Sequence, residues 1–142
     1  MADQLSHAQR SQLMARIKAR DTSPERIVRS IVRDLGFNHR IHATKLPGTP
    51  DIVIGSVRTA IFVHGCFWHR HSCRRGRSCP STDAAFWEAK FTKNIRRDQR
   101  AARALRRLGW SVIVVWECQT ARVKRGGINL RLGRFLGLRP LA

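Results

Sequence analysis

The sequence predicts an α/β domain in which a mixed β-sheet is flanked by helices. Short apolar runs of the length of buried strands occur in the middle and near the end of the chain. Two longer segments repeat apolar residues with the period of an amphipathic helix. The 142 residues contain no internal repeat and no low-complexity linker. We therefore expect one domain over residues 1–142 with the element order α-α-β-β-β-α-β.

Two helices are expected before the first strand. Ser6 can cap a helix that runs to about Arg20, and the few apolar residues of this helix indicate an arm rather than a core element. The second helix is expected to start at Ser23-Pro24, because Ser is a favoured N-cap and Pro fits the first helical position. Gly36 is expected to end it. Its apolar stripe consists of Ile27, Val28, Ile31, Val32 and Leu35.

The remaining elements are four strands and two helices. Strands are expected over residues 37–42, 51–54, 59–63 and 110–116. Gly55-Ser56 indicates a hairpin between the second and third strands. A long helix is expected over residues 84–108, ended by Gly109, and a short last helix over residues 128–136. This last helix falls in a basic tail, residues 119–142.

The charge of the chain points to a polyanionic partner. It carries 28 Lys and Arg residues against 9 Asp and Glu residues, a net charge of +19. Cations that neutralise phosphates release condensed counterions, and this release drives binding to nucleic acid. The forked guanidinium of arginine, which predominates here, suits contacts to phosphate and to guanine edges. A ribosomal or chromatin-coating protein would show the same charge, so the composition predicts the partner and no activity.

The location and the state of the cysteines are predicted together. No apolar run approaches the roughly 18 residues of a membrane span, and Met-Ala-Asp-Gln at the start resembles no secretory signal. We therefore expect a cytosolic protein, in which thiols stay reduced. Two disulfides, in one of three connectivities, are the alternative for the four cysteines, but clustered cysteines in the cytosol favour a metal site.

The segment Ile61-Phe-Val-His-Gly-Cys-Phe-Trp-His-Arg-His-Ser-Cys73 predicts such a metal site. Cys66, His71 and Cys73 supply three ligands of the kind that tetrahedral zinc uses. A fourth must come from Cys79, which would make a local site, or from Cys118, which would tie the loop to a core strand. Three cysteines and one histidine form a closed, structural set with no position for a catalytic water.

A separate group of residues suggests phosphodiester hydrolysis. Asp51 opens a strand directly after a Pro-containing turn, where nucleases of the Pro-Asp…(Asp/Glu)-x-Lys type place a magnesium-binding carboxylate. The second half of that motif is missing, because Val63 and Gly65 occupy the acidic and lysine positions. His64 and His69 flank this gap and could serve as base and acid.

Each of these residues also has an ordinary structural explanation. Asp51 could cap a turn, and Glu25, the other candidate carboxylate, is favoured by the helix dipole in the first turn of its helix. His64 and His69 could be hydrogen-bonded loop residues or alternative zinc ligands. The neighbouring aromatic residues Phe67 and Trp68 fit wedges that separate stacked bases in a basic protein.

Taken together, these residues resemble the very-short-patch mismatch-repair endonucleases, bacterial enzymes that nick DNA beside a T:G mismatch. The resemblance covers roughly residues 6–118, and its longest run is the metal-loop segment from Ile61 to Cys73. The other matching segments are residues 11–14, Arg20-Asp-Thr22, Glu25, Leu46-Pro-Gly-x-Pro-Asp51, Phe86-Trp87-x-x-Lys90, Lys93-Asn94, Arg97-Asp98, Leu108-Gly-Trp110 and Val114-Val-Trp-Glu-Cys118.

The resemblance implies a fold, two metals and a set of roles. The fold would be restriction-endonuclease-like, with structural Zn²⁺ on Cys66, His71, Cys73 and Cys118. Catalytic Mg²⁺ would bind Asp51 and the backbone carbonyl of Val63, and His69 would activate water with help from His64 and Glu25. The residues that would be inserted beside the mismatch are Phe67, Trp68, Trp87 and, from an N-terminal DNA-contacting arm of residues 1–20, Met14.

Some matters stay open at this stage. Trp87 lies four residues before Phe91 and could instead extend the apolar stripe of its helix. A family member has Thr where this chain has Val63, which matters only if the hydroxyl orients His69. A monomer is the default expectation, because the sequence carries no signal of oligomeric state. The expected location is the bacterial cytoplasm, associated with the nucleoid. The resemblance further implies that the protein acts on double-stranded DNA with a T:G mismatch and has mismatch-repair coupling proteins as partners. The alternatives are a zinc-stabilised, non-catalytic nucleic-acid-binding protein and a fold-related nuclease with another target.

Overall fold

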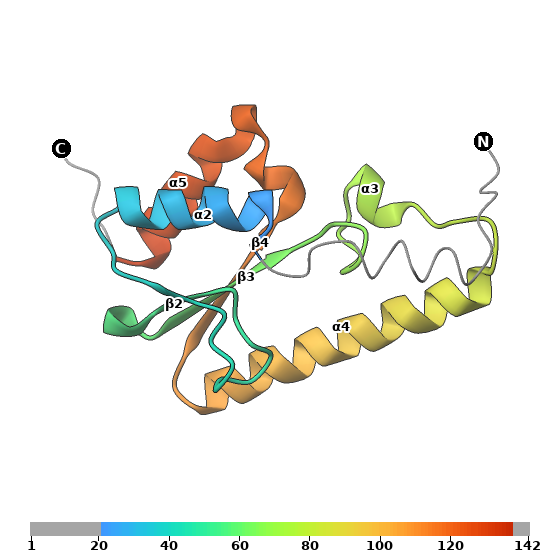
Figure 1. Ribbon diagram of the computed structural model, residues 1–142, viewed down its shortest axis with the longest axis horizontal. Helices are drawn as coiled ribbons and strands as arrows, with labels where there is room; N and C mark the ends of the chain where they lie inside the picture. The colour runs from blue at the N-terminus through green and yellow to red at the C-terminus, as the bar shows by residue number, and fades with distance from the viewer. Residues whose placement is uncertain (1–20, 138–142) are drawn as a thin grey trace.

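The structure, a computed structural model, describes residues 21–137 and has the predicted α/β class (Figure 1). The expected N-terminal arm, with Met14, lies outside these residues. The helices are α2 (Ser23–Asp34), α3 (Arg74–Arg77), α4 (Ala84–Arg107) and α5 (Arg125–Phe135). The strands are β1 (Arg40–Ile41), β2 (Ile52–Ile54), β3 (Thr59–His64) and β4 (Ser111–Trp116). Three short 3-10 turns, η1 (Gly55–Val57), η2 (Glu117–Thr120) and η3 (Arg122–Lys124), connect these elements.

The four strands form one mixed sheet in the order β1-β2-β3-β4. The β1–β2 and β2–β3 pairs are antiparallel, and the Gly55-Ser56 signal corresponds to η1 between β2 and β3. The β3–β4 pair is parallel, and α4 lies on the long connection between these two strands. Two parallel strands need a long crossover connection, and α4 provides it for β3 and β4.

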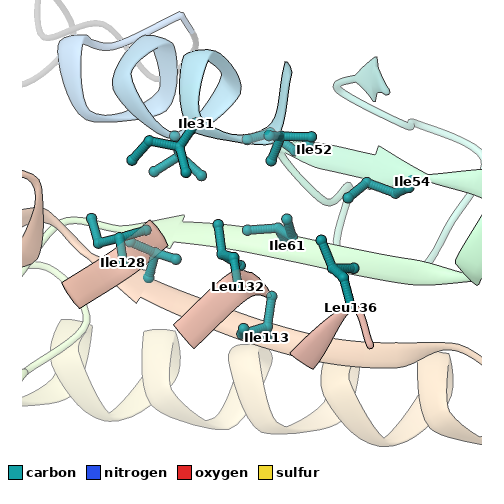
Figure 2. Close-up of a cluster of buried hydrophobic side chains, with 11 residues drawn as sticks. Ile31, Ile52, Ile54, Ile61, Ile113, Ile128, Leu132 and Leu136 are labelled. Carbon is teal, nitrogen blue, oxygen red and sulfur yellow. The ribbon is translucent and has the colours of Figure 1, made fainter. Parts of the chain in front are cut away.

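The helices form layers on the two faces of the sheet. In Figure 1, α2 and α5 lie on one side of the strands and α4 lies on the other. The main core fills the space between α2, α5 and the sheet, where Figure 2 shows Ile31, Ile128 and Leu132 facing the strand residues Ile52 and Ile61. Each fully buried aliphatic side chain of this kind stabilises the fold by about 1.5–3 kcal/mol.

The structure corrects several predicted element boundaries. The N-cap of α2 is Thr22 rather than Ser23, because the Thr22 hydroxyl accepts the N–H of Glu25 at 3.4 Å. The first strand is reduced to two residues, and the left-handed φ of 48° at His42 ends it. The metal loop contains the short helix α3, which has no apolar periodicity to predict it. The last helix begins three residues earlier than expected, at Arg125.

Helix α4 ends as predicted, at a glycine with a left-handed backbone. Gly109 has a φ of 88°, a conformation that a residue with a Cβ rarely adopts. Its N–H donates to the carbonyl of Arg106 at 3.0 Å and so satisfies one free carbonyl of the last turn. The chain then enters β4 directly. Within residues 21–137, no helix is long and apolar enough to cross a membrane.

Candidate active site and metal centre

The register of β3 and β4 brings two distant cysteines together. The two strands are parallel neighbours that pair His64 with Trp116. Cys66 and Cys118 each lie two residues beyond this pair, so they leave the sheet side by side. The N–H of Cys118 donates to the sulfur of Cys66 at 3.3 Å. The end of the sheet therefore carries two thiols from segments 52 residues apart in the sequence.

His71 and Cys73 complete a group of four potential ligands with Cys66 and Cys118. One ligand atom from each of these residues lies within 4.8 Å of the others. Cys118 Sγ and His71 Nδ1 are 3.5 Å apart. Two ligands of a tetrahedral zinc ion, with bonds of about 2.3 and 2.1 Å, lie about 3.6 Å apart, so the residues fit zinc in both type and spacing. Cys79 is exposed and does not belong to this group.

The conformation of the metal loop depends on Gly76 in α3. A Cβ at this position would lie 1.9 Å from the carbonyl oxygen of His71, far closer than two non-bonded atoms can approach. The backbone N–H of Gly76 also donates to the thiol of Cys73 and lowers its pKa to about 6. Burial acts in the opposite direction on Cys66 and raises the pKa of its thiol to about 12. Gly76 thus permits the turn that brings Cys73 beside His71.

A second group joins His64 and His69 to Asp98 of α4. His69 Nδ1 lies 2.5 Å from Asp98 Oδ2, so the proton of the neutral ring is on Nδ1, where the N–H donates to the carboxylate. Nε2 then carries no proton, and its lone pair can accept one. His64 Nδ1 is 3.7 Å from the same oxygen, beyond hydrogen-bond distance, and the two imidazole rings meet edge to face at 3.9 Å. Burial lowers the pKa of His64 to about 3, which keeps this ring neutral near pH 7.

A third group consists of Glu25, His42 and Asp51. Glu25 lies in the first turn of α2 but is only 3% exposed, and its Oε2 is 3.1 Å from His42 Nε2. Asp51 Oδ2 accepts the backbone N–H of Val63 at 2.7 Å. Burial, together with the nearby Glu25 carboxylate, raises the pKa of Asp51 to about 6 despite this hydrogen bond. Two partly desolvated carboxylates close together are a typical arrangement for binding a divalent cation.

The second and third groups share one cleft. The cleft has a volume of about 770 Å³ and is lined by Glu25, His42, Asp51, His64, His69 and Asp98, among others. Lys90 and Arg97 of α4 contribute positive charge to its wall. Gly48 also lines the cleft, and here the turn before Asp51 packs so closely against α4 that an added Cβ would lie 2.4 Å from the Ala101 side chain. The cleft therefore combines hard oxygen ligands, imidazoles and cations that attract phosphate.

Aromatic residues lie beside the cleft and join the metal loop to α4. The ring of Phe67 contacts Trp68, Trp87 and Phe91 at centroid distances of 5.0, 5.7 and 5.2 Å. Trp87 is only 3% exposed, so in this conformation it extends the buried stripe of α4. Phe67 and Trp68 are partly exposed. Asn94 fixes the loop by donating from Nδ2 to the carbonyl of Trp68 at 3.1 Å.

Trp116 connects the metal group to the histidine group. Its ring stacks on His71 at 4.5 Å and lies 5.3 Å from His64. The structure thus gathers the predicted residues Glu25, Asp51, His64 and His69 in one cleft and the four predicted zinc ligands next to it. Val63 lies at the cleft as well.

The sequence assigned no role in the site to Asp98 or His42, although Asp98 lies in a segment that matches the family. Asp98 is one of only two acidic residues, with Glu88, in a 24-residue helix rich in arginine, and this contrast is the signal that could have identified it. His42 had no such signal, since a histidine at the end of a short strand is unremarkable until the position of Glu25 is known.

Comparison with known proteins gives a consistent result. Residues 2–75 match the family described as DNA mismatch endonuclease Vsr. The chain is 43% identical to the type II nicking enzyme V.XorIIP of Xanthomonas oryzae pv. oryzae over 136 residues, which is 96% of this chain and 98% of that protein. It is 43% identical to the DNA mismatch endonuclease Vsr of Escherichia coli over 118 residues, 83% of this chain and 75% of that protein. It is 40% identical to the type II nicking enzyme V.NmeAIP of Neisseria meningitidis over 84% of both chains.

Proposed function

The chain belongs to the Vsr family of DNA mismatch endonucleases, and we propose that it nicks one DNA strand 5′ to the T of a T:G mismatch by magnesium-dependent hydrolysis. Membership in a family of endonucleases favours catalysis over a non-catalytic nucleic-acid-binding role. One observation supports the proposed mechanism above all: the Glu25–His42–Asp51 group and the His64–His69–Asp98 group line the same cleft. The proposal includes the restriction-endonuclease-like fold and a single catalytic domain with a DNA-contacting arm and a basic tail.

The proposed magnesium ligands are Asp51 and the backbone carbonyl of Val63. The N–H of Val63 points to Asp51, and in a β-strand the N–H and C=O of one residue point to the same side. The carbonyl therefore faces the same region, and a valine supplies it as well as a threonine would. Bound Mg²⁺ would stabilise negative charge on the scissile phosphate.

His69 is the proposed general base. With Nδ1–H held by Asp98, the lone pair of Nε2 can accept a proton from the attacking water as the water oxygen bonds to phosphorus. One P–O ester bond of the same phosphate breaks as this bond forms. The neutral His64 packs edge to face against His69 and limits the orientations of that ring. Glu25 adds negative charge beside Asp51 and fixes His42.

The aromatic residues account for mismatch preference in this proposal. A T:G pair stacks less well than a Watson–Crick pair, so separating it from its neighbour costs less of the few kcal/mol that unstacking a step requires. Phe67 and Trp68 are exposed enough to contact bases from the loop. Trp87 would reach DNA only if the aromatic cluster rearranged, and Met14 would act from the arm. Stacking on such rings returns about 1–3 kcal/mol per base.

The zinc proposal assigns a structural role to Cys66, His71, Cys73 and Cys118. A closed set of four protein ligands leaves no position for water, so the metal would hold the loop against the end of β4. Metal analysis of two matched variants tests this assignment. Cys118→Ser should lose stoichiometric zinc, whereas Cys79→Ser should keep it. Full zinc content in Cys118→Ser would contradict the ligand set.

The reaction is tested by strand nicking on two labelled duplexes that differ only in a T:G or T:A pair, with Mg²⁺ and without divalent cations. We expect nicking of the T strand of the T:G duplex only, and only with Mg²⁺. Equal cleavage of both duplexes would leave a nuclease without mismatch specificity. Cleavage without a divalent cation would contradict the role of Asp51.

A further inference from the structure

We propose that the outer face of α4 is a second track for the backbone of duplex DNA, separate from the catalytic cleft. The outer cationic stripe consists of Lys93, Arg96, Arg100, Arg103 and Arg107, which are all exposed. Their spacing of three and four residues places them on one side of the helix, in a row about 21 Å long. The proposal rests on the enzyme acting on DNA, and it concerns a surface that the nicking chemistry does not use.

The stripe lies on a different face of α4 from the cleft. Lys90 and Arg97, the cleft-lining cations of α4, lie about a quarter turn around the helix from the stripe. The buried residues of α4, such as Phe91, Ala101 and Leu105, lie farther round still. In Figure 1, α4 forms one edge of the molecule, with no described element beyond it. The arginines of the stripe are therefore exposed on a face of α4 beside the cleft, and none of them lines the cleft.

The charges of the stripe have no counter-ions in the part of the chain that the structure describes. No salt bridge within residues 21–137 involves any of the five residues. Of the two acidic residues of α4, Asp98 is held by His69 and Glu88 lies before the stripe begins. Like charges three and four residues apart destabilise a helix. The stripe thus weakens the isolated helix, and an anionic partner would reverse this effect.

A DNA backbone complements the stripe in charge. Successive cations lie about 4.5–6 Å apart along the helix axis, so the row carries several cations within reach of one duplex surface. One strand of a duplex presents a phosphate about every 3.4 Å of its axis but winds around that axis, so the straight row meets only the few phosphates on the facing side. A shallow groove of about 600 Å³ runs along this face of α4. It is lined by Thr92 and by four residues of the stripe, Lys93, Arg96, Arg100 and Arg103. A track of this kind would keep the enzyme on undamaged DNA during its search for rare mismatches.

The test compares two triple variants with the same change in charge. The stripe variant is Arg96→Gln, Arg100→Gln and Arg103→Gln. The control is Arg33→Gln, Arg131→Gln and Arg134→Gln, three exposed arginines of α2 and α5 in the helical layer across the sheet. Gln has a helix propensity close to that of Arg, so both proteins should fold. The melting temperature of the stripe variant should be no lower than wild type, and that of the control slightly lower, because Arg33 and Arg134 lie in the last turns of their helices.

Binding of a fully matched duplex is measured without Mg²⁺ between about 50 and 200 mM KCl. Three lost phosphate contacts should reduce the slope of log Kd against log salt by about 2–3, equivalent to about a 40-fold smaller loss of affinity over that range. The control should change the slope by less than about 1. Equal slopes in the two variants would overturn the proposal, because the stripe would then act only through net charge.

Two further arms identify the source of the DNA and separate this proposal from the catalytic one. If the stripe variant changes the salt slope for a duplex of about 40 base pairs but not for one of about 14 base pairs, the flank of the cleft-bound duplex occupies the stripe. Binding of a second duplex of about 14 base pairs, lost only in the stripe variant, would mean a separate molecule. Nicking at saturating T:G duplex should be the same in all three proteins. Absence of nicking in the wild type would overturn the proposed reaction and leave the salt-slope result standing.

Discussion

Two histidines of the cleft have different environments and therefore different roles. His64 is buried beside β4, and its low pKa keeps it neutral. His69 lies on the loop, and its Nδ1 hydrogen bond to Asp98 fixes which nitrogen carries the proton. A neutral ring in a fixed orientation suits a positioning role, while an imidazole whose Nε2 is free can accept a proton. The pair Asp98–His69 is thus the feature whose loss should affect the rate most selectively.

We predict that Asp98→Asn lowers kcat for nicking by about 100- to 10,000-fold and leaves KM and duplex affinity nearly unchanged. An amide can donate to Nδ1 and stabilise the wrong tautomer of His69, but it does not alter the DNA-binding surface. Single-turnover nicking and a binding assay measure the two effects. The matched control is Glu88→Gln, the other acidic residue of α4, which is exposed and should behave like wild type. A loss of affinity equal to the loss of rate would mean that Asp98 acts through DNA binding.

Asp51 illustrates a functional residue that lowers stability. Its pKa is about 6 in the folded protein and 3.8 as an ordinary aspartate, so the folded state binds the proton more tightly than the unfolded state. Stability is therefore gained as the pH falls from about 6 towards 4, and the full penalty applies above pH 6. A difference of about two pKa units corresponds to about 3 kcal/mol as an upper value.

Asp51→Asn should consequently raise the melting temperature at pH 8 in magnesium-free buffer while it abolishes nicking. The stabilisation should be about 1–3 kcal/mol, because the amide removes a desolvated charge and its oxygen can still accept the N–H of Val63. The difference from wild type should shrink at pH 4.5, where Asp51 is protonated. Thermal denaturation at the two pH values measures both effects. A variant less stable than wild type at pH 8 would show that the hydrogen bond to the carboxylate outweighs desolvation.

The residues of the site were easier to predict from the sequence than the contacts that they make. The types at Asp51, His64 and His69 already indicated hydrolysis beside a metal loop. Their contacts did not follow, because Asp98 lies 29 residues after His69 and meets it only once α4 crosses the sheet. Asp51 and Val63 meet for a similar reason, across the β2–β3 hairpin. Trp87 shows the reverse case, in which the ordinary explanation as a core residue fits its burial.

At the scale of elements, the metal loop depends on two neighbours. Helix α4 holds it through Asn94, and the end of β4 holds it through Cys118. The sequence alone left Cys79 and Cys118 as equal candidates, because the choice depends on the parallel register of β3 and β4, which no local pattern encodes. By contrast, the apolar stripes and the glycines after α2 and α4 are local signals, and they predicted these helices to within a few residues.

We predict that Gly76→Ala disrupts the loop and that Gly133→Ala does not. The new methyl group at position 76 would clash with the backbone of His71, so the loop must move and the metal group is distorted. At Gly133 in α5 an added Cβ meets no atom within 4 Å, and replacing glycine by alanine in a helix is worth about 0.5–1 kcal/mol of stability. Zinc content and melting temperature should therefore fall in the first variant and hold or rise in the second. Normal zinc content in Gly76→Ala would contradict the close packing of α3 on His71.

At the scale of the whole molecule, the main core and most of the proposed active site occupy different regions, although Glu25 of α2 also lines the cleft. The main core joins α2, α5 and the strands, and none of the four proposed zinc ligands belongs to it (Figure 2). The cleft, the metal loop and the aromatic cluster lie towards α4 and the ends of β3 and β4. Separate support for the two regions means that one can be disturbed without unfolding the other.

Removal of zinc should accordingly abolish nicking without unfolding the protein. With the ligands free, the loop loses its connection to Cys118, and His69 loses its position because it lies between Cys66 and His71. The core between α2, α5 and the sheet should persist, so far-ultraviolet circular dichroism should change little. Tryptophan fluorescence should change clearly, because Trp68, Trp87 and Trp116 all contact the loop or each other. A strong chelator followed by zinc re-addition measures loss and recovery. Complete loss of helical signal on chelation would show that the core depends on the metal, and the two regions would then form one cooperative unit.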